Sequence, residues 1–191
     1  MIANLAPGGR AFTSNVFLVE GERVVLIDPG NDFDVVSEIE ARVDGLDAVI
    51  LTHTHPDHVG NLEAVKEAFG VDAWGFDADR SGVDHAIADG DSVQAGDHEY
   101  VALHTPGHKN DHLCLYARDP GVLFAGDLVF ENGGFGRTDL EEGNRERLID
   151  SIDRLLDAID APTVLYAGHG ERVTDDPRGT IEAARRMART L

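Results

Sequence analysis

The stretch VILTHTHPDHVGN, residues 49–61, ends an apolar run with a cluster of polar side chains. The apolar run predicts a buried strand, and within the next seven residues come His53, His55, Asp57 and His58. Because residues i and i+2 of an extended segment project to the same side, His53 and His55 can reach one metal ion. Pro56 bends the chain, so Asp57 and His58 are expected to face a second ion. The stretch therefore predicts the beginning of a metal centre.

Other polar residues follow predicted strands elsewhere in the chain. They are Asp28 after residues 23–27, His108 after 98–105, Asp127 after 121–126 and His169 after 162–167. Chain reversals bring strand ends together at one edge, where loops carry function. His104 and His112 flank this group and are possible hydrogen-bond partners of the ligands.

Seven of these side chains form a donor set for two divalent ions that share a carboxylate. They are His53, His55, Asp57, His58, His108, Asp127 and His169. Imidazoles and carboxylates suit zinc first, with iron or manganese as alternatives. Two such ions about 3.5–4 Å apart can hold a hydroxide between them at neutral pH.

Helices and strands interleave along the chain, which predicts an α/β fold. The expected strands are 15–20, 23–28, 47–52, 71–76, 98–105, 112–117, 121–127 and 162–170, and the expected helices are 34–43, 61–69, 145–159 and about 178–190. Asp34 is the expected N-cap of the first helix, and Gly70 is expected to end the second. Strand pairs come early and again in the middle, which favours two sheets over one doubly wound sheet.

The composition indicates a folded and strongly acidic protein. The chain has 191 residues, 42% of them hydrophobic, which predicts a single domain over 1–191 with its own core. It carries 36 acidic against 16 basic residues and a formal net charge of −20. Such surfaces are typical of halophilic proteins, because carboxylates stay hydrated in molar salt, where the Debye length is about 3 Å. An ordinary acidic protein is the alternative.

Charge and hydropathy also predict partners and location. The sequence has no basic patch for nucleic acid and no apolar run of about 18 residues that could span a membrane. The N-terminal stretch MIANLAPGGRAFTSN does not resemble a signal peptide, so a cytoplasmic protein is expected. The sequence leaves the oligomeric state open.

The motifs resemble those of the metallo-β-lactamase superfamily. They are T52-H-T-H-P-D-H58, T105-P-G-H108, A125-G-D127 and Y166-A-G-H169-G170, with Asp28 in LIDPG matching an early aspartate. The resemblance implies a four-layer αβ/βα sandwich. By carry-over, His53, His55 and His108 bind the first metal, Asp57, His58 and His169 bind the second, and Asp127 bridges. Asp28 would hold a ligand imidazole, and Asp57 would also orient the hydroxide or pass its proton.

The loop 134–143, GFGRTDLEEG, resembles that of short glyoxalase II-like proteins, which are hydroxyacylglutathione hydrolase-like. This implies hydrolysis of a small-molecule thioester or ester, with Arg137 near a carboxylate of the substrate's thiol portion. A surface ion pair of Arg137 with Asp139 or Glu141 is the alternative. Only about twenty residues follow His169, so the C-terminal helical domain of full-length glyoxalase II is expected to be absent, and another low-molecular-weight thiol is an alternative to glutathione.

Other activities of the same family stay open. The same loop also resembles that of persulfide dioxygenases, in which His53, His108 and Asp127 would hold a single iron with positions open for O₂. The complete second site favours the dinuclear hydrolase. Lactonases, other esterases and a non-catalytic metal-binding module are further alternatives. A true β-lactamase is disfavoured, because the family's largest subclass has Cys at the position of Asp127 and is secreted.

Overall fold

The structure, a computed structural model, describes residues 1–6 and 12–190, which form two compact units. Unit 1 comprises Met1–Ile87 and Gln94–Glu99, and unit 2 comprises Ala88–Val93 and Tyr100–Leu191. Part of the N-terminal stretch, residues 7–11, lies outside the described residues, and the single domain over 1–191 stays a prediction. No helix in the described part of the chain is long and apolar enough to cross a membrane.

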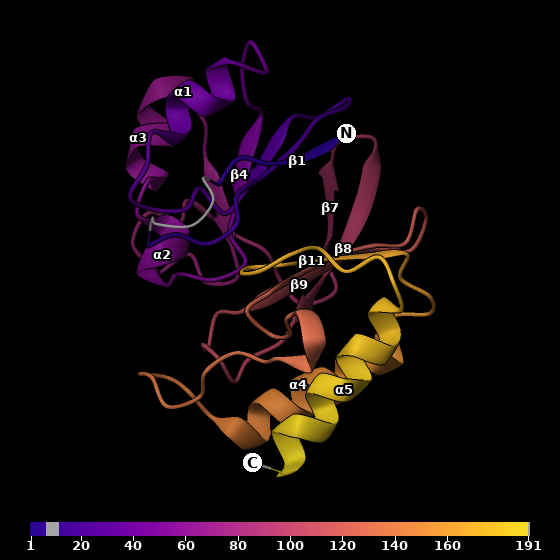
Figure 1. The fold of residues 1–191 in the computed structure, drawn as a ribbon. Helices are drawn as coiled ribbons and strands as arrows, with labels where there is room; N and C mark the ends of the chain where they lie inside the picture. Colours follow the sequence, from indigo (N-terminus) through magenta and orange to yellow (C-terminus); the bar gives the residue numbers. More distant parts are fainter. Residues whose placement is uncertain (7–11, 191) are drawn as a thin grey trace. The chain divides into compact units, whose positions relative to one another are not determined.

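Unit 1 contains a six-stranded sheet with three helices (Figure 1). Its strands, in spatial order, are β1 (Ile2–Asn4), β2 (Phe17–Val19), β3 (Val25–Ile27), β4 (Ala48–Ile50), β5 (Ala73–Gly75) and β6 (His85–Ala86). The pairs from β1 to β3 are antiparallel, and those from β3 to β6 are parallel. The helix α1 (Val35–Glu40) connects β3 to β4, and α2 (Pro56–Val59) and α3 (Leu62–Phe69) connect β4 to β5.

Two helices of unit 1 have residues at their ends that favour the beginning or the end of a helix. Asp34 accepts a hydrogen bond from Ser37 N at 3.2 Å, which caps α1 as predicted. Gly70 adopts the left-handed conformation at φ 65° and ends α3, also as predicted. The buried faces of α1 and α3 pack in one hydrophobic cluster with β2, β3 and β4. This packing holds β4, and therefore the residues that follow it, in a fixed place.

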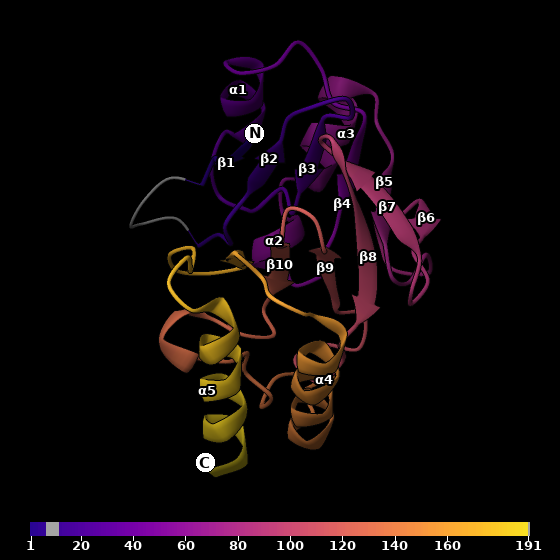
Figure 2. The same ribbon diagram turned by 90° about the vertical axis from the view of Figure 1, so that its right-hand side faces the viewer.

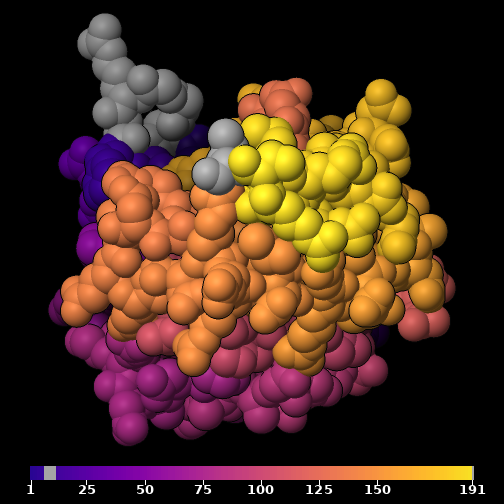
Figure 3. Space-filling model, turned by 90° about the horizontal axis from the view of Figure 1, so that it is seen from below, coloured from indigo at the N-terminus to yellow at the C-terminus, as the bar shows by residue number. Residues whose placement is uncertain are grey.

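The five-stranded sheet has the order β11 (Val164–Ala167), β10 (Val122–Gly126), β9 (Leu113–Ala117), β8 (His98–His104) and β7 (Ser92–Ala95). In unit 2, β10 pairs with β11 in parallel and with β9 in antiparallel orientation. The helices α4 (Arg145–Ala158) and α5 (Pro177–Thr190) lie side by side, as Figure 2 shows. Their atoms, orange and yellow, occupy much of the face drawn in Figure 3.

The core of unit 2 forms between this helix pair and the strands. α4 buries Leu148, Ile152 and Leu155 at helical spacing, and α5 buries Ile181 beside small alanines. Each buried Leu or Ile contributes about 1.5–3 kcal/mol relative to an exposed one. The predicted helix 145–159 is thereby confirmed within one residue.

The other predicted helices and strands are also present, and the structure adds elements that the sequence analysis did not expect. These are β1, β6, β7, the one-turn helix α2 and a short 3-10 helix η1 (Glu131–Gly133). Each is four residues long or shorter. Elements of this length carry too few residues for a periodic pattern.

Candidate metal centre

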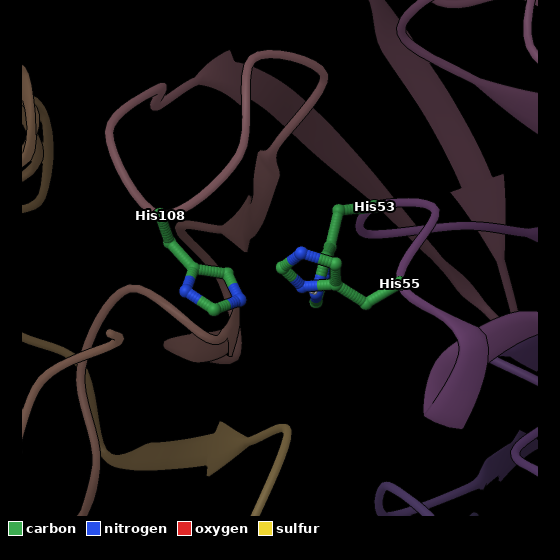
Figure 4. Close-up of side chains that lie close together, drawn as sticks. All are labelled: His53, His55 and His108. Atoms are coloured by element: carbon green, nitrogen blue, oxygen red, sulfur yellow. Dashed lines mark hydrogen bonds between the residues drawn. The ribbon is translucent and has the colours of Figure 1, made fainter. Parts of the chain in front are cut away.

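In unit 1, the polar cluster lies where β4 ends and α2 begins. His53 and His55 leave the extended segment after β4, with the Nε2 of His53 3.1 Å from the Nδ1 of His55 (Figure 4). Pro56 is the first residue of α2, and this single helical turn carries Asp57 and His58. The ring centroids of His53 and His58 are 4.0 Å apart. One short segment therefore gathers three imidazoles, as the spacing predicted.

A buried hydrogen-bond network beneath these rings fixes how they are protonated. Asp28 Oδ2 accepts from Thr52 Oγ1 at 2.6 Å and lies 2.8 Å from His58 Nδ1. Thr52 Oγ1 lies 3.1 Å from His53 Nδ1. Because an ionised carboxylate only accepts, His58 Nδ1 carries a proton and donates it to Asp28. The single hydroxyl proton of Thr52 also goes to Asp28, so that hydroxyl accepts from His53 Nδ1.

Both rings are thus in the tautomer whose lone pair is on Nε2. That is the form in which a neutral imidazole binds a metal while its other nitrogen donates to a second group. Asp28 adopts a left-handed backbone at φ 53°, which is uncommon outside glycine but tolerated by Asp. Its backbone N–H donates to Ile50 O at 3.0 Å, so β4 holds it in place. The predicted contact of Asp28 with a candidate ligand imidazole is present.

In unit 2, His108 lies on the loop that follows β8 and is drawn in Figure 4. Its Nδ1 donates to the backbone carbonyl of Arg137 at 2.8 Å, so its lone pair is also on Nε2. Gly136 makes this approach possible, because a Cβ there would lie 2.9 Å from His108 Nδ1. The GRTD loop therefore orients His108 through its backbone.

Asp127, also in unit 2, lies between two imidazoles. Its Oδ2 is 3.4 Å from His108 Nε2 and 3.5 Å from His169 Nε2. The carboxylate is buried, while His169 is partly exposed. A buried carboxylate flanked by two imidazole nitrogens suits a ligand shared by two cations, because each cation offsets the cost of burying the charge.

His112 fixes the backbone of Asp127. The Asp127 N–H donates to His112 Nε2 at 3.0 Å, so His112 Nδ1 carries the proton and donates to Thr105 Oγ1 at 2.8 Å. His112 and Thr105 are fully buried. His112 thus holds the backbone of the candidate ligand Asp127 in place. His104 instead donates from Nε2 to Asn110 O at 2.7 Å and supports the loop that carries His108.

Arg137 forms the surface ion pair that was the alternative to substrate binding. Its Nε and Nη2 donate to the two carboxylate oxygens of Asp139 at 3.0 and 2.8 Å, and both side chains are about two-thirds exposed. These hydrogen bonds lower the pKa of Asp139 to about 2. The side chain of Arg137 thus contacts Asp139, and its backbone carbonyl contacts the candidate metal ligand His108. Binding of a substrate carboxylate by Arg137 stays a prediction.

Two threonines and one glycine were not singled out from the sequence. Thr52 and Thr105 each precede a histidine motif, in LTHTH and HTPGH, and each binds an imidazole nitrogen. Gly136 precedes Arg137 in the GRTD loop. The shared threonine before both motifs was a usable signal. The need for Gly136 was not, because it arises from the backbone oxygen of Asp127 and the ring of His108, which only the folded chain brings against it.

Comparison with known proteins identifies the family to which this chain belongs. The sequence model of the metallo-beta-lactamase superfamily matches residues 9–81 and 74–187. A hydroxyacylglutathione hydrolase, GloC, from Haemophilus influenzae is 31% identical over 189 residues, covering 86% of this chain and 89% of the relative.

Several solved structures are similar in fold to this chain. ETHE1 from Myxococcus xanthus has a TM-score of 0.78 at 26% identity, covering 100% of this chain and 91% of that one. TTHA1623 in a di-iron-bound form has a TM-score of 0.76 at 28% identity, covering 91% and 94%. The BLEG-1 B3 metallo-beta-lactamase has a TM-score of 0.78 at 25% identity, covering 91% and 94%. The predicted fold class is confirmed, and this chain belongs to the metallo-β-lactamase superfamily.

Proposed function

We propose that this protein is a dinuclear metal-dependent hydrolase that cleaves a small-molecule thioester. The observation that carries the proposal is the buried carboxylate of Asp127 with an imidazole nitrogen on either side, at 3.4 and 3.5 Å. The similarity to a protein named as a hydroxyacylglutathione hydrolase supports the thioester. The fold alone does not choose among substrates.

In this proposal the seven candidate donors form two metal sites. One ion takes His53, His55 and His108, the other takes Asp57, His58 and His169, and Asp127 is shared. Support comes from the groups of side chains that could hold a metal ion, which include both triplets and a third made of His53, His58 and Asp127. Zinc is the first expectation, and the di-iron form of a structural relative makes iron the second.

Two divalent ions held by these donors would lower the pKa of a water to about 7 and polarise the scissile carbonyl. Asp57 is proposed to orient this water and to accept its proton. Asp28, through His58 and Thr52, keeps the ligand imidazoles in the required tautomer. The leaving thiolate has a conjugate acid of pKa about 8.5, so it needs no strong general acid.

Arg137 is proposed to bind a carboxylate of the substrate's thiol portion. A guanidinium binds a carboxylate with two parallel hydrogen bonds, which is the geometry that Arg137 now makes with Asp139. Because exposed ion pairs contribute little stability, a substrate carboxylate can replace Asp139 at low cost.

The test is elemental analysis of protein purified without chelators, followed by assays on a panel of thioesters. We expect close to two ions per chain and thioester turnover. Asp127→Ala and His108→Ala should abolish turnover and lower the metal content together. His98→Ala, at an exposed histidine of β8, should change neither. Full turnover in Asp127→Ala would contradict the dinuclear mechanism.

A persulfide dioxygenase is the second candidate. The contact of His108 with Asp127 would supply two of the three ligands of a mononuclear iron site, with His53 as the third. The structural likeness to ETHE1 fits this candidate. A single iron per chain, with oxygen uptake on a persulfide and no thioester turnover, would select it over the hydrolase.

A further inference from the structure

A carboxylate in unit 2 lies beside the candidate ligand His169 and is not used by the proposed mechanism. Glu131 and Phe130 belong to the turn after β10, which we name the Glu131 turn (residues 130–134). The Phe130 ring is 6.0 Å from the His169 ring, in an edge-on arrangement. Glu131 Oε1 is 2.9 Å from the position that a Cβ of Gly170 would occupy. Consecutive residues of the turn thus cover consecutive residues of the motif, His169 and Gly170.

The Glu131 turn is held firmly. Phe130 N donates to Gly134 O at 2.9 Å, and a β-bridge joins Val129 to Phe135 at its base. At the tip, Gly133 lies against α5 so closely that a Cβ would be 2.8 Å from that of Ala183. The carboxylate is therefore presented by a backbone that is already ordered, which lowers the entropic cost of binding a ligand.

Glu131 is half-buried and has no hydrogen bond or ion pair from its side chain to any described residue. It also belongs to none of the triplets suited to hold a metal ion. A partly desolvated carboxylate is stabilised by a donor, and a cationic donor stabilises it most. Glu131 is therefore a carboxylate that a cationic ligand would stabilise, whereas Arg137 of the following loop forms an exposed ion pair with Asp139 that a substrate carboxylate would have to replace.

We propose that Glu131 binds an ammonium group in the thiol portion of the substrate. This inference rests on the proposed thioester hydrolase and narrows its substrate class to thiols that carry an amine. A substrate that also carries a carboxylate could use Arg137 at the same time. Gly170 is then required, because a side chain there would displace the carboxylate of Glu131.

The test compares three probes that differ only in their terminal group. They are 6-(methylthio)hexylamine, 6-(methylthio)hexanol and 6-(methylthio)hexanoate, which contain no free thiol to remove the metal. Binding to the metal-loaded protein is measured by calorimetry for the wild type, Glu131→Gln and Glu141→Gln. The last variant removes the same charge from an exposed position of the following loop, so it controls for the attraction of any cation to an acidic protein.

We expect the wild type to bind the amine about tenfold more tightly than the alcohol, as one hydrogen bond between charged groups predicts. Glu131→Gln should erase this preference, and Glu141→Gln should keep it. Equal binding of amine and alcohol, or a preference that survives in Glu131→Gln, would overturn the inference. Turnover of S-lactoyl thioesters of the corresponding thiols is assayed in parallel. An amine preference that depends on Glu131, without any turnover, would support the ammonium site and contradict the proposed hydrolase.

Discussion

At the scale of single residues, the most connected side chain is Asp28. It lies at the end of β3, away from the HTHPDH motif in sequence, yet it accepts hydrogen bonds from Thr52 and His58. Through Thr52 it also determines the tautomer of His53. Asp28 is not one of the candidate metal ligands, but it determines the tautomer of two of them, His53 and His58.

Replacing Asp28 by Asn should weaken metal binding rather than remove it. The amide of the Asn side chain can both donate and accept, so it no longer requires His58 and Thr52 to be the donors. The affinity for the metal should therefore fall about 10–100-fold. Competition with a chelator of known affinity measures this change. Asp32→Asn is the matched control, because Asp32 is exposed and has a similar left-handed backbone at φ 60°. Equal affinities in Asp28→Asn and the wild type would contradict the role of Asp28.

Asp84 should make part of the stability of unit 1 depend on pH. The backbone hydrogen bond from Ala73, followed by the hydrogen bond from Lys66, lowers the pKa of Asp84 below its ordinary value of 3.8. A carboxyl group with a lowered pKa in the folded state stabilises it above that ordinary value, and this stability is lost as the pH falls through the folded pKa. Denaturation with urea from pH 7 down to pH 3 should show a smaller loss for Asp84→Asn than for the wild type. Parallel curves would contradict the assignment.

At the scale of elements, α4 and α5 complete each other's C-terminal ends. Arg145 begins α4 and donates to Ala188 O near the end of α5 at 2.8 Å. Arg178, near the beginning of α5, donates to Leu156 O and Ile159 O at the end of α4 at 3.1 and 2.9 Å. The terminal carbonyls of a helix lack partners within it, and a cation there also interacts favourably with the helix dipole.

Arg178→Met should therefore destabilise unit 2 while keeping most of the side chain's packing. We expect a loss of about 1 kcal/mol, because water can replace part of the hydrogen bonding at this partly exposed position. The unfolding free energy from urea denaturation checks this value. Arg186→Met, at an exposed position of the same helix, should change stability by less than about 0.5 kcal/mol. A similar loss in both variants would assign the effect to helix propensity or surface charge.

The length of an element determined whether its sequence pattern could predict it. The helix 145–159 carries apolar residues at helical spacing over four turns, so its pattern is unambiguous. The strand β4 is short, but its apolar run, which ends abruptly at the polar motif, was enough to predict it. α2 and β6 have four and two residues, and neither has a pattern of its own. Their conformations follow from neighbours: Pro56 begins α2, and β6 pairs with β5.

At the scale of the whole molecule, the net charge of −20 is the dominant property. Like charges repel one another at low ionic strength, and this repulsion opposes the compact state. Salt screens it, since the Debye length falls from about 10 Å at 0.1 M to about 3 Å at 1 M.

We therefore expect the midpoint of thermal unfolding to rise steeply between 0.1 and 2 M KCl. The rise should be larger than for a protein of similar size with a net charge near zero, measured in the same buffers. Scanning calorimetry of both proteins provides the comparison. A midpoint that is independent of KCl would contradict the halophilic interpretation, which stays a prediction from composition.

The sequence by itself determined the family and indicated the candidate donor residues, because metal chemistry depends on residue type and the candidate ligands come in short local motifs. It also indicated the main helices and strands, whose apolar spacing is local. Only the tertiary structure decided the protonation of the imidazoles, the contact of Arg137 O with His108 and the place of Glu131 over Gly170. These depend on pairs far apart in the chain, such as Asp28 with Thr52 at a separation of 24 and His108 with Arg137 at 29. Hydrogen bonds act over about 3 Å, so no pattern along the chain can specify them before the strands bring both partners together.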